Sequence, residues 1–198
     1  MDLSFSVHKL ANISENPGKV KIEGLVHLLR YIRENKTFGL KYYADMNDAP
    51  VTDLLRQASI KTKNHFMAFS DSIWQKNSGT SRSTGTYIIF YQCGPIDHGT
   101  HVPGAVSQSS ADSEYNAPCI IGMGLAQFRM LFHEMLKHDP EIVPEGDPLI
   151  VLDSKFAMCM DNTGNYTKHT RHVARTIHFV RNEEKCKMHK IDWCEVGL

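Results

Sequence analysis

The sequence contains no Cys-x-x-Cys pair, no long apolar run and no excess of charge of either sign. Its five cysteines are widely spread and odd in number, which argues against a disulfide framework and favours a reducing compartment. No run approaches the roughly 18 apolar residues that a membrane-spanning helix needs. The opening stretch, MDLSFSVHKLANISENPG, has no long apolar segment, so we expect no signal peptide and no membrane partner.

Charge balance leaves the binding partner open. Lys plus Arg and Asp plus Glu each number 22, so overall charge predicts no partner, and a nucleic-acid surface would need local clustering. The 198 residues, of which 41% are hydrophobic, suit one domain with a real core and a small flanking element.

Hydrophobic periodicity predicts a helix near the start of the chain, over 19–34. Its apolar stripe is expected to belong to a core and consists of Ile22, Leu25, Val26, Leu29 and Ile32. A short strand is expected over 39–45. The polar segment 46–64 is expected to be a linker or long loop, with a short helix over 51–58 as an option.

The next part of the chain favours an antiparallel meander. Residues 65–71 and 86–92 are expected to form strands, and a third strand is expected to start near Ile96. A capping box at 109–112 then opens helical periodicity that continues through Leu136.

Proline and glycine interrupt this long helical segment. Pro118 lies inside it, and Gly122 and Gly124 weaken it further. Because an interior proline costs about 3 kcal/mol, we expect a kink or a break near 117–124.

The rest of the chain adds strands and helices in alternation. We expect a buried strand over 147–153, a short helix over 154–160, a basic helix over 170–184 and a last strand over 190–196. The whole order predicts an α/β fold, a mixed sheet with helices packed on it.

Three carboxylates occupy positions that could converge at one edge of this sheet. Asp71 closes the first strand of the meander, Glu114 lies one turn into the following helix, and Asp153 closes the buried strand. Such groups repel one another unless a divalent cation neutralises them, and hard oxygen ligands suit magnesium or manganese. Two such ions can support phosphodiester cleavage. From spacing alone, turn formation, helix capping or solvated carboxylates are the favoured explanation of these residues.

Histidine pairs and a basic segment offer other sites. His98 and His101 could bind a metal or form a polar hairpin, and residues 169–189, with His169, His172, Cys186 and His189, could bind zinc. Arg171 and Arg175, four residues apart on one helix face, could follow phosphates or lie on a solvated face balanced by Glu183 and Glu184.

Five segments in order resemble the ribonuclease H domain of copia-type retrotransposon polyproteins. FSDSIWQ resembles SDADWA, SRSTGTYIIF resembles RRSTSGYVFF, and GPIDHGTHVPGAVSQSSADSEYNA resembles GPISWKSKKQPTVALSSTEAEYIA without a gap. LIVLDSKFAM resembles TIYCDNQSAI, and TKHTRHVARTIHFVRN resembles HSRTKHIDIRYHFIRE. Upstream, the SVHKLANISENPG region and GLKY are similar to the last part of the reverse transcriptase region.

The resemblance implies a domain division and a fold. Residues 1–45 would be the remnant of the reverse transcriptase C-terminal region, 46–64 a linker, and 65–198 a ribonuclease H-like domain truncated before its last helix. That domain would hold a mixed sheet, with three antiparallel strands and then parallel strands, flanked by helices.

The resemblance also implies an activity, namely Mg²⁺-dependent or Mn²⁺-dependent hydrolysis of the RNA strand of RNA–DNA hybrids. Asp71, Glu114 and Asp153 would be the catalytic metal ligands, and Asp112 would be a helix cap. The nucleic-acid-binding residues would be Arg171, His172, Arg175 and Arg181. Partners would be the hybrid and the remainder of the Pol polyprotein, in a cytoplasmic virus-like particle or in the nucleus.

The chain departs from the family at several positions. The family's fourth carboxylate, in a segment like QLADILTK, has no counterpart after IDWCEVGL, so activity is expected to be weak or lost. A Trp and a Lys of the family correspond to His98 and His101, which removes positive charge at neutral pH. The alternative is a catalytically inactive nucleic-acid-binding or structural fragment of a decayed or domesticated retroelement.

Overall fold

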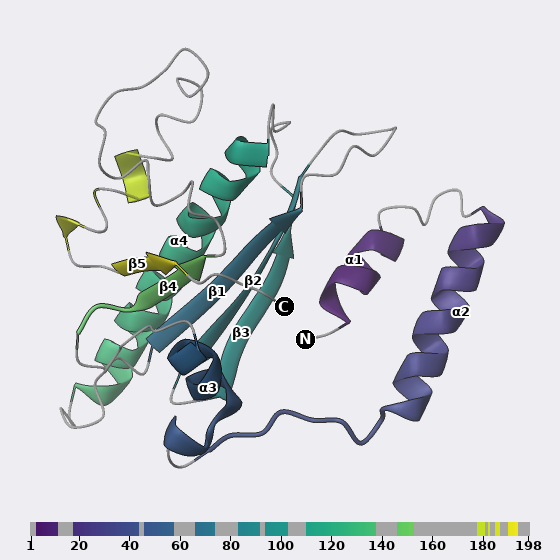
Figure 1. Ribbon diagram of the computed structural model, residues 1–198, viewed down its shortest axis with the longest axis horizontal. Coiled ribbons are helices and arrows are strands. Elements are labelled where there is room, and N and C mark those ends of the chain that lie inside the picture. The colour runs from purple at the N-terminus through teal and green to yellow at the C-terminus, as the bar shows by residue number, and fades with distance from the viewer. Residues whose placement is uncertain are drawn as a thin grey trace. The chain divides into compact units, whose positions relative to one another are not determined.

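The computed structural model describes most of the helices and strands of the chain (Figure 1). The described residues are 3–11, 18–43, 46–57, 66–73, 83–91, 94–102, 110–137, 146–152, 178–180, 182, 185–186 and 190–193. The chain divides into two compact units, Met1–Lys41 and Tyr42–Leu198, which are described separately here.

The first unit consists of two helices. They are α1, Ser4–Ala11, and α2, Lys19–Glu34, and α2 has the predicted bounds. Leu10 of α1 packs beside Gly24 of α2, where an added Cβ would lie 3.7 Å from Leu10 Cδ2. Over these ranges neither helix holds a buried residue.

The expectation that the apolar stripe of α2 is core is wrong within this unit. The stripe is exposed, with Leu29 at 57% and Ile22 at 51%. The physical reason is that α1, with only eight residues, can cover little of a helix of sixteen. The predicted strand over 39–45 is also wrong for its described residues, because residues 39–43 form no strand pairing.

The second unit begins with short helical elements that pack into the core. They are η1, Met46–Asp48, and α3, Pro50–Gln57, which matches the optional helix over 51–58. Ala49, Val51 and Leu55 are buried against strand residues. This part of the segment expected as a linker is therefore packed structure, because its three apolar residues cover one face of the sheet.

Five strands form one mixed sheet in the order β3-β2-β1-β4-β5. The strands are β1, Phe66–Ile73, β2, Thr84–Tyr91, β3, Gly94–His101, β4, Leu149–Leu152, and β5, Lys190–Trp193. β1, β2 and β3 pair antiparallel, whereas β1–β4 and β4–β5 are parallel. The predicted α/β arrangement, three antiparallel strands and then parallel ones, is confirmed.

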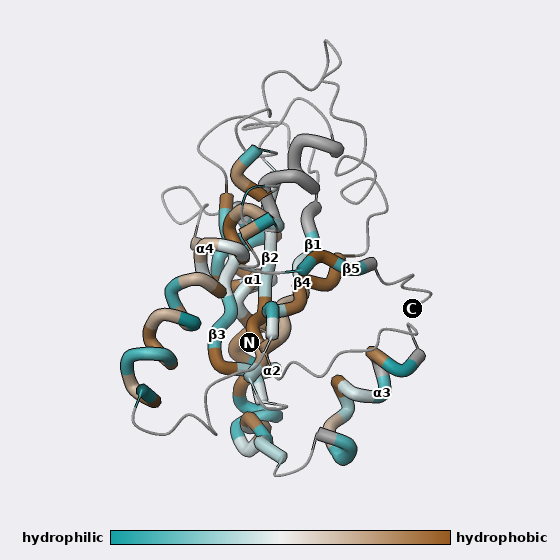
Figure 2. Tube along the Cα trace, turned by 90° about the vertical axis from the view of Figure 1, so that its left-hand side faces the viewer, coloured by the Kyte–Doolittle hydropathy of each residue, from teal (hydrophilic) through white to brown (hydrophobic). Residues whose placement is uncertain are grey.

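Hydrophobic side chains cover both faces of the sheet because successive strand residues point to opposite sides. Met67, Leu149 and Val151 face α3, whereas Phe66, Ala68 and Ile150 belong to the cluster packed against α4, Ser110–Leu136. β4 is buried at all four positions and is hydrophobic along its whole length (Figure 2). The sheet is thus a central layer with helices on both faces.

The long helix α4 runs without a break across one face of the sheet (Figure 1). The break expected near 117–124 is therefore not found, although Pro118 does lie inside the helix. Ile121 and Leu125 are fully buried against the sheet, and their burial stabilises the helix by about 1.5–3 kcal/mol each. Gly124 lets the helix approach β2 closely, because an added Cβ would lie 3.3 Å from Ile89 Cδ1.

Several predicted elements fall outside the described residues. They include the helix over 154–160 and most of the basic helix over 170–184, of which residues 178–180 and 182 are described and helical. Among the described helices, none has the length and hydrophobicity that a membrane crossing requires.

Candidate metal and nucleic-acid site

Asp71 lies near the C-terminal end of β1, the central strand of the sheet. It pairs with Thr86 of β2 and its side chain is exposed. Met67 and Phe69, four and two residues earlier, lie in or against the cluster on the α3 face. Because strand side chains alternate, Asp71 extends that same row beyond the apolar cluster.

The parallel pairing of β1 with β4 sets what lies beside Asp71. Met67 pairs with Leu149, and the register keeps the same offset through Ser70 and Leu152. The next residue of β1 is Asp71 and the next residue of the sequence after Leu152 is Asp153. Asp153 lies outside the described residues.

The direction of α4 brings its first turns to the same end of the sheet (Figure 1). Phe128 and Phe132, late in α4, contact Phe66 at the start of β1, with ring centroids 6.4 and 5.6 Å apart. The helix therefore runs antiparallel to β1. From Phe66 to Asp71 the strand rises about 17 Å, and from Phe128 to Glu114 the helix rises about 21 Å, so the backbone of Glu114 reaches the level of Asp71.

Hydroxyl groups fix the backbone around Asp71. Ser70 Oγ donates to the carbonyl of Thr86 at 3.2 Å, and Thr86 Oγ1 donates to the carbonyl of Asp71 at 3.5 Å. These contacts tie β1 to β2 at the end of the strand, beyond the apolar core. Both hydrogen bonds therefore hold the backbone of Asp71 against β2.

A second polar contact lies on the α4 face of the sheet. Tyr87 donates its hydroxyl to Asp97 Oδ2 at 3.3 Å. Burial raises the pKa of Tyr87, and the charge of Asp97 and this hydrogen bond raise it further. Burial also raises the pKa of Tyr91. Asp97 is thereby engaged in holding the β2–β3 pair.

No three metal-ligating side chains cluster among the residues that the structure describes. The predicted ligand set includes Asp153, which lies outside the described residues. Of the rest of the set, the structure brings Asp71 and the first turns of α4, which contain Glu114, to one end of the sheet. Asp112 lies in the first turn of α4, and its role as a helix cap stays a prediction.

The alternative metal sites gain nothing from the described residues. His98 and His101 are both exposed on β3, but residues three apart in a strand point to opposite faces, so they cannot share an ion within one strand. Of the zinc alternative, Cys186 is a free, exposed cysteine, whereas His169, His172 and His189 lie outside the described part of the chain. The predicted nucleic-acid-binding residues Arg171, His172, Arg175 and Arg181 lie outside it as well.

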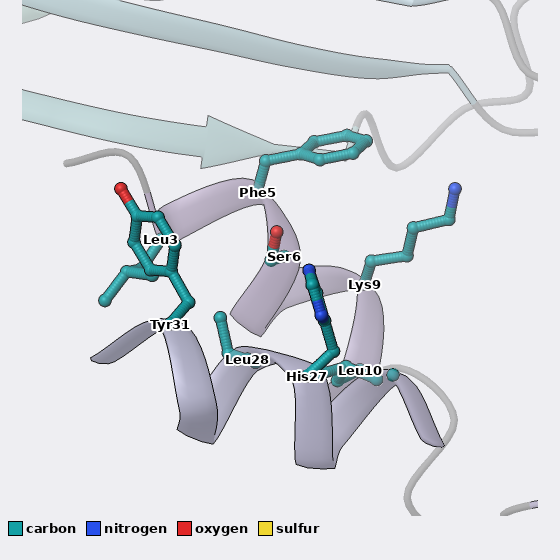
Figure 3. Close-up of a pocket in the computed structure, with 9 residues that line it drawn as sticks. Leu3, Phe5, Ser6, Lys9, Leu10, His27, Leu28 and Tyr31 are labelled. Atoms are coloured by element: carbon teal, nitrogen blue, oxygen red, sulfur yellow. The ribbon is translucent and has the colours of Figure 1, made fainter. Parts of the chain in front are cut away.

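A hollow of about 470 Å³ lies within the first unit, between α1 and α2 (Figure 3). Phe5, Leu28 and Tyr31 give it apolar walls, and Lys9 and His27 extend beside it. The Lys9 ammonium lies 5.5 Å from the centroid of the Phe5 ring, a cation–π distance. Its lining residues include no carboxylate, so it is not the predicted metal site.

Two residues near Asp71, Thr86 and Thr100, were not identified as candidate site residues from the sequence. Thr86 and Thr100 lie opposite each other in the β2–β3 pair, and Asp71 lies opposite Thr86. The threonines raise the strand propensity of their segments, which is the only signal they give locally. Their alignment depends on the register of three strands.

Comparisons with known proteins agree with the resemblance of the sequence. Over 182 residues the chain is 21% identical to the retrovirus-related Pol polyprotein from transposon RE1 of Arabidopsis thaliana, a match that covers 92% of this chain and 11% of that protein. It is 23% identical over 185 residues to the polyprotein from transposon RE2, with the same coverage. The chain thus spans about a tenth of the length of these relatives. No protein-family model matches it.

Among solved structures, the chain is similar to ribonuclease H1 from the halophilic archaeon Halobacterium salinarum. The TM-score is 0.41 and the sequence identity 13%, over 65% of this chain and 80% of that one. The two relatives confirm the predicted resemblance to a retrotransposon Pol polyprotein. The strand order and directions described above agree with the ribonuclease H-like fold predicted with it.

Proposed function

We propose that this domain hydrolyses the RNA strand of RNA–DNA hybrids in the reverse transcription of a copia-type retrotransposon. Asp71, Glu114 and Asp153 would hold Mg²⁺ or Mn²⁺. The observation that carries the proposal is the parallel register of β1 and β4. If the pairing continued by one residue, Asp153 would lie beside Asp71, since neighbouring strands are about 4.8 Å apart.

The chemistry of the donor set fits a hard divalent cation. The three predicted ligands are carboxylates, and Asp71 is exposed at the end of its strand rather than paired within a core. Carboxylate oxygens suit Mg²⁺ and Mn²⁺ better than thiolate-binding metals. When bound, such ions activate a water and stabilise charge on the leaving oxygen of a phosphodiester.

The chain's own residues would position the metal ligands. β1 and β4, buried at the centre of the sheet, hold the backbones that precede Asp71 and Asp153. The packing of α4 on the sheet fixes the level of Glu114. A rigid scaffold of this kind keeps ligand positions within the narrow range that metal-assisted hydrolysis requires.

We further propose that the domain acts as part of a longer polyprotein. The support is that the chain aligns over 92% of its own length but only 11% of the relative's length. The first unit, whose apolar stripe on α2 is exposed, would then be the end of a reverse transcriptase region.

Cleavage of a labelled RNA–DNA hybrid in Mg²⁺ or Mn²⁺ tests the proposal. The full chain is compared with Asp71→Asn, and with Asp53→Asn as a matched control, because Asp53 is an exposed carboxylate of α3 paired with Arg56 at 2.7 Å. We expect cleavage by the native chain and by Asp53→Asn, and none by Asp71→Asn. Binding of the hybrid by folded protein without cleavage under any of these conditions would favour the inactive nucleic-acid-binding fragment instead.

A further inference from the structure

We propose that Thr86, Thr100 and His98 form a binding row that holds the sugar–phosphate backbone of the RNA strand beside Asp71. The inference deepens the proposed nuclease function and rests on it. It assigns to β2 and β3 the positioning of the strand that is to be cleaved.

The register of the sheet places these side chains on one face. Asp71 lies opposite Thr86, and Thr86 lies opposite Thr100, so the three residues form one row across β1, β2 and β3. Directly opposed residues of an antiparallel pair point to the same side of the sheet. The row therefore begins at the candidate metal ligand and ends on the edge strand.

His98 joins the row from the neighbouring position on the same face. It lies opposite Ile88, which in turn lies opposite Phe69. Phe69 packs against the cluster on the α3 face, so His98 is on that face too, two residues from Thr100. His98 is exposed, and Thr86 and Thr100 are partly exposed.

The apolar cluster on this face lies at the other end of β1. Ala49, Val51 and Leu55 pack against Met67, Leu149 and Val151, which belong to the first half of β1 and to β4. The face thus changes along the strands from apolar and covered at Met67 to polar and accessible at Asp71 and Thr86.

The row has the chemistry and the size of a backbone-binding surface. Most hydrogen bonds to a nucleic acid go to phosphate and sugar, and hydroxyl groups are common donors for them. A threonine hydroxyl can also pair with the 2′-hydroxyl of RNA as donor or acceptor. Two strand spacings span about 10 Å, which is the axial rise of about three base pairs of a duplex.

Charge on this part of the face also suits a polyanion. Next to Asp71, the side chains that the structure describes on this face of β2 and β3 are the hydroxyls of Thr84, Thr86 and Thr100, the imidazole of His98 and apolar groups. Thr84 is buried, whereas Thr86 and Thr100 are partly exposed. The carboxylate of β3, Asp97, pairs with Ile89 and bonds Tyr87, both in contact with the α4 cluster, so it belongs to the opposite face. Among the described side chains of β2 and β3 on this face none is a carboxylate, so a phosphate in the row would meet the carboxylate of Asp71, which the metal would neutralise together with the other proposed ligands.

A matched pair of histidine variants tests the row. His98→Asn and His101→Asn alter two exposed residues of one strand that point to opposite faces. Dissociation constants are measured for the full chain with a labelled RNA–DNA hybrid, in chelator to prevent cleavage. We expect His98→Asn to weaken binding about two- to tenfold, the factor that one lost hydrogen bond corresponds to, and His101→Asn to leave it unchanged.

The threonines are tested with Thr86→Val and Thr100→Val, which keep the branched shape that strands favour. Each is expected to weaken binding by a similar factor. Because Thr86→Val also removes the hydrogen bond to the Asp71 carbonyl, affinities are compared on protein shown to be folded. A DNA–DNA duplex of the same sequence identifies the contact: a loss for the hybrid alone indicates the 2′-hydroxyl, and an equal loss for both duplexes indicates phosphate. Either result supports the row.

Unchanged affinity in His98→Asn and in both valine variants would overturn the inference. Equal losses in His98→Asn and His101→Asn would do the same, because the effect would then not belong to one face. The nuclease proposal fails separately, if the native chain binds the hybrid through this row but does not cleave it in Mg²⁺ or Mn²⁺.

Discussion

The hydroxyl of Tyr87 donates a hydrogen bond to Oδ2 of Asp97 at 3.3 Å, across the β2–β3 pair and beside the bulge at Ile89. The contact ties the edge strand to the sheet at a point where the ladder is irregular. Burial raises the pKa of Tyr87, and the nearby Asp97 carboxylate raises it further. The neutral phenol is therefore the form that the folded state prefers.

Replacing Tyr87 with Phe is expected to lower the free energy of unfolding at neutral pH by about 0.5–1.5 kcal/mol, the usual contribution of one hydrogen bond. Because the folded-state pKa is raised, this contribution is fully present below the ordinary tyrosine pKa of about 10 and is lost as pH rises through the folded pKa. Urea unfolding at neutral and alkaline pH measures both effects. The prediction fails if native and Tyr87→Phe lose stability equally above about pH 10.

Gly99 allows the ring of Tyr87 to lie over β3. A Cβ at this position would lie 2.5 Å from Tyr87 Cε1, whereas a Cβ at Gly85, in the neighbouring strand, would meet nothing nearer than 4.0 Å. Gly99→Ala is therefore expected to cost about 1–3 kcal/mol through overpacking. Gly85→Ala should be neutral or stabilising by up to about 1 kcal/mol. Denaturant titration of the two variants compares them, and equal costs would contradict the close approach.

Leu125 and Leu131 lie on different faces of α4, about 120° apart around the helix axis. Leu125 is fully buried against the sheet, and Leu131 is 50% exposed. Leu125→Ala is expected to lower the free energy of unfolding by about 2–5 kcal/mol, through lost burial and the cavity left behind. Leu131→Ala should change it by about 0.5 kcal/mol or less. A large effect in both variants would mean that the outer face of α4 is covered as well.

Metal binding at the carboxylates predicts a stability effect that does not depend on catalysis. Millimolar Mg²⁺ or Mn²⁺ should raise the melting temperature of the native chain, because a ligand that binds only the folded state stabilises it, by about 2.7 kcal/mol at a hundredfold excess over Kd. Asp71→Asn should not respond, since one ligand is gone. Asp53→Asn should respond like the native chain. A response retained in Asp71→Asn would place the metal elsewhere.

Local sequence patterns predicted much of the second unit. The meander of β1, β2 and β3 and the buried strand β4 were predicted from alternation and from continuous apolar runs, with ends that differ by a few residues. These signals are reliable because they report which faces are buried. The bounds of α2 were predicted correctly for the same reason, although its stripe is exposed in its own unit.

The continuous course of α4 could not be predicted from propensity. Pro118 and Gly124 weaken an isolated helix, but Pro118 is buried and Gly124 meets Ile89 across the helix–sheet contact. Tertiary burial outweighs the local cost, and that burial depends on residues far away in the sequence. The same limit applies to the site. Asp71 was identified by its place at a strand end, whereas its row with Thr86 and Thr100 follows from strand register alone.

The pairing of β1 with β4 also bears on how the domain folds. Ile73 meets Thr84 across a short connection, but Met67 must meet Leu149, 82 positions along the chain. Closing the longer loop costs more conformational entropy, and contacts of this kind slow folding. The antiparallel hairpins can form early, while the central parallel pair must wait for α4 and β4. The pairing of Asp71 with Thr86 can therefore form early, but a nascent chain would complete the proposed site only after β4 had been synthesised.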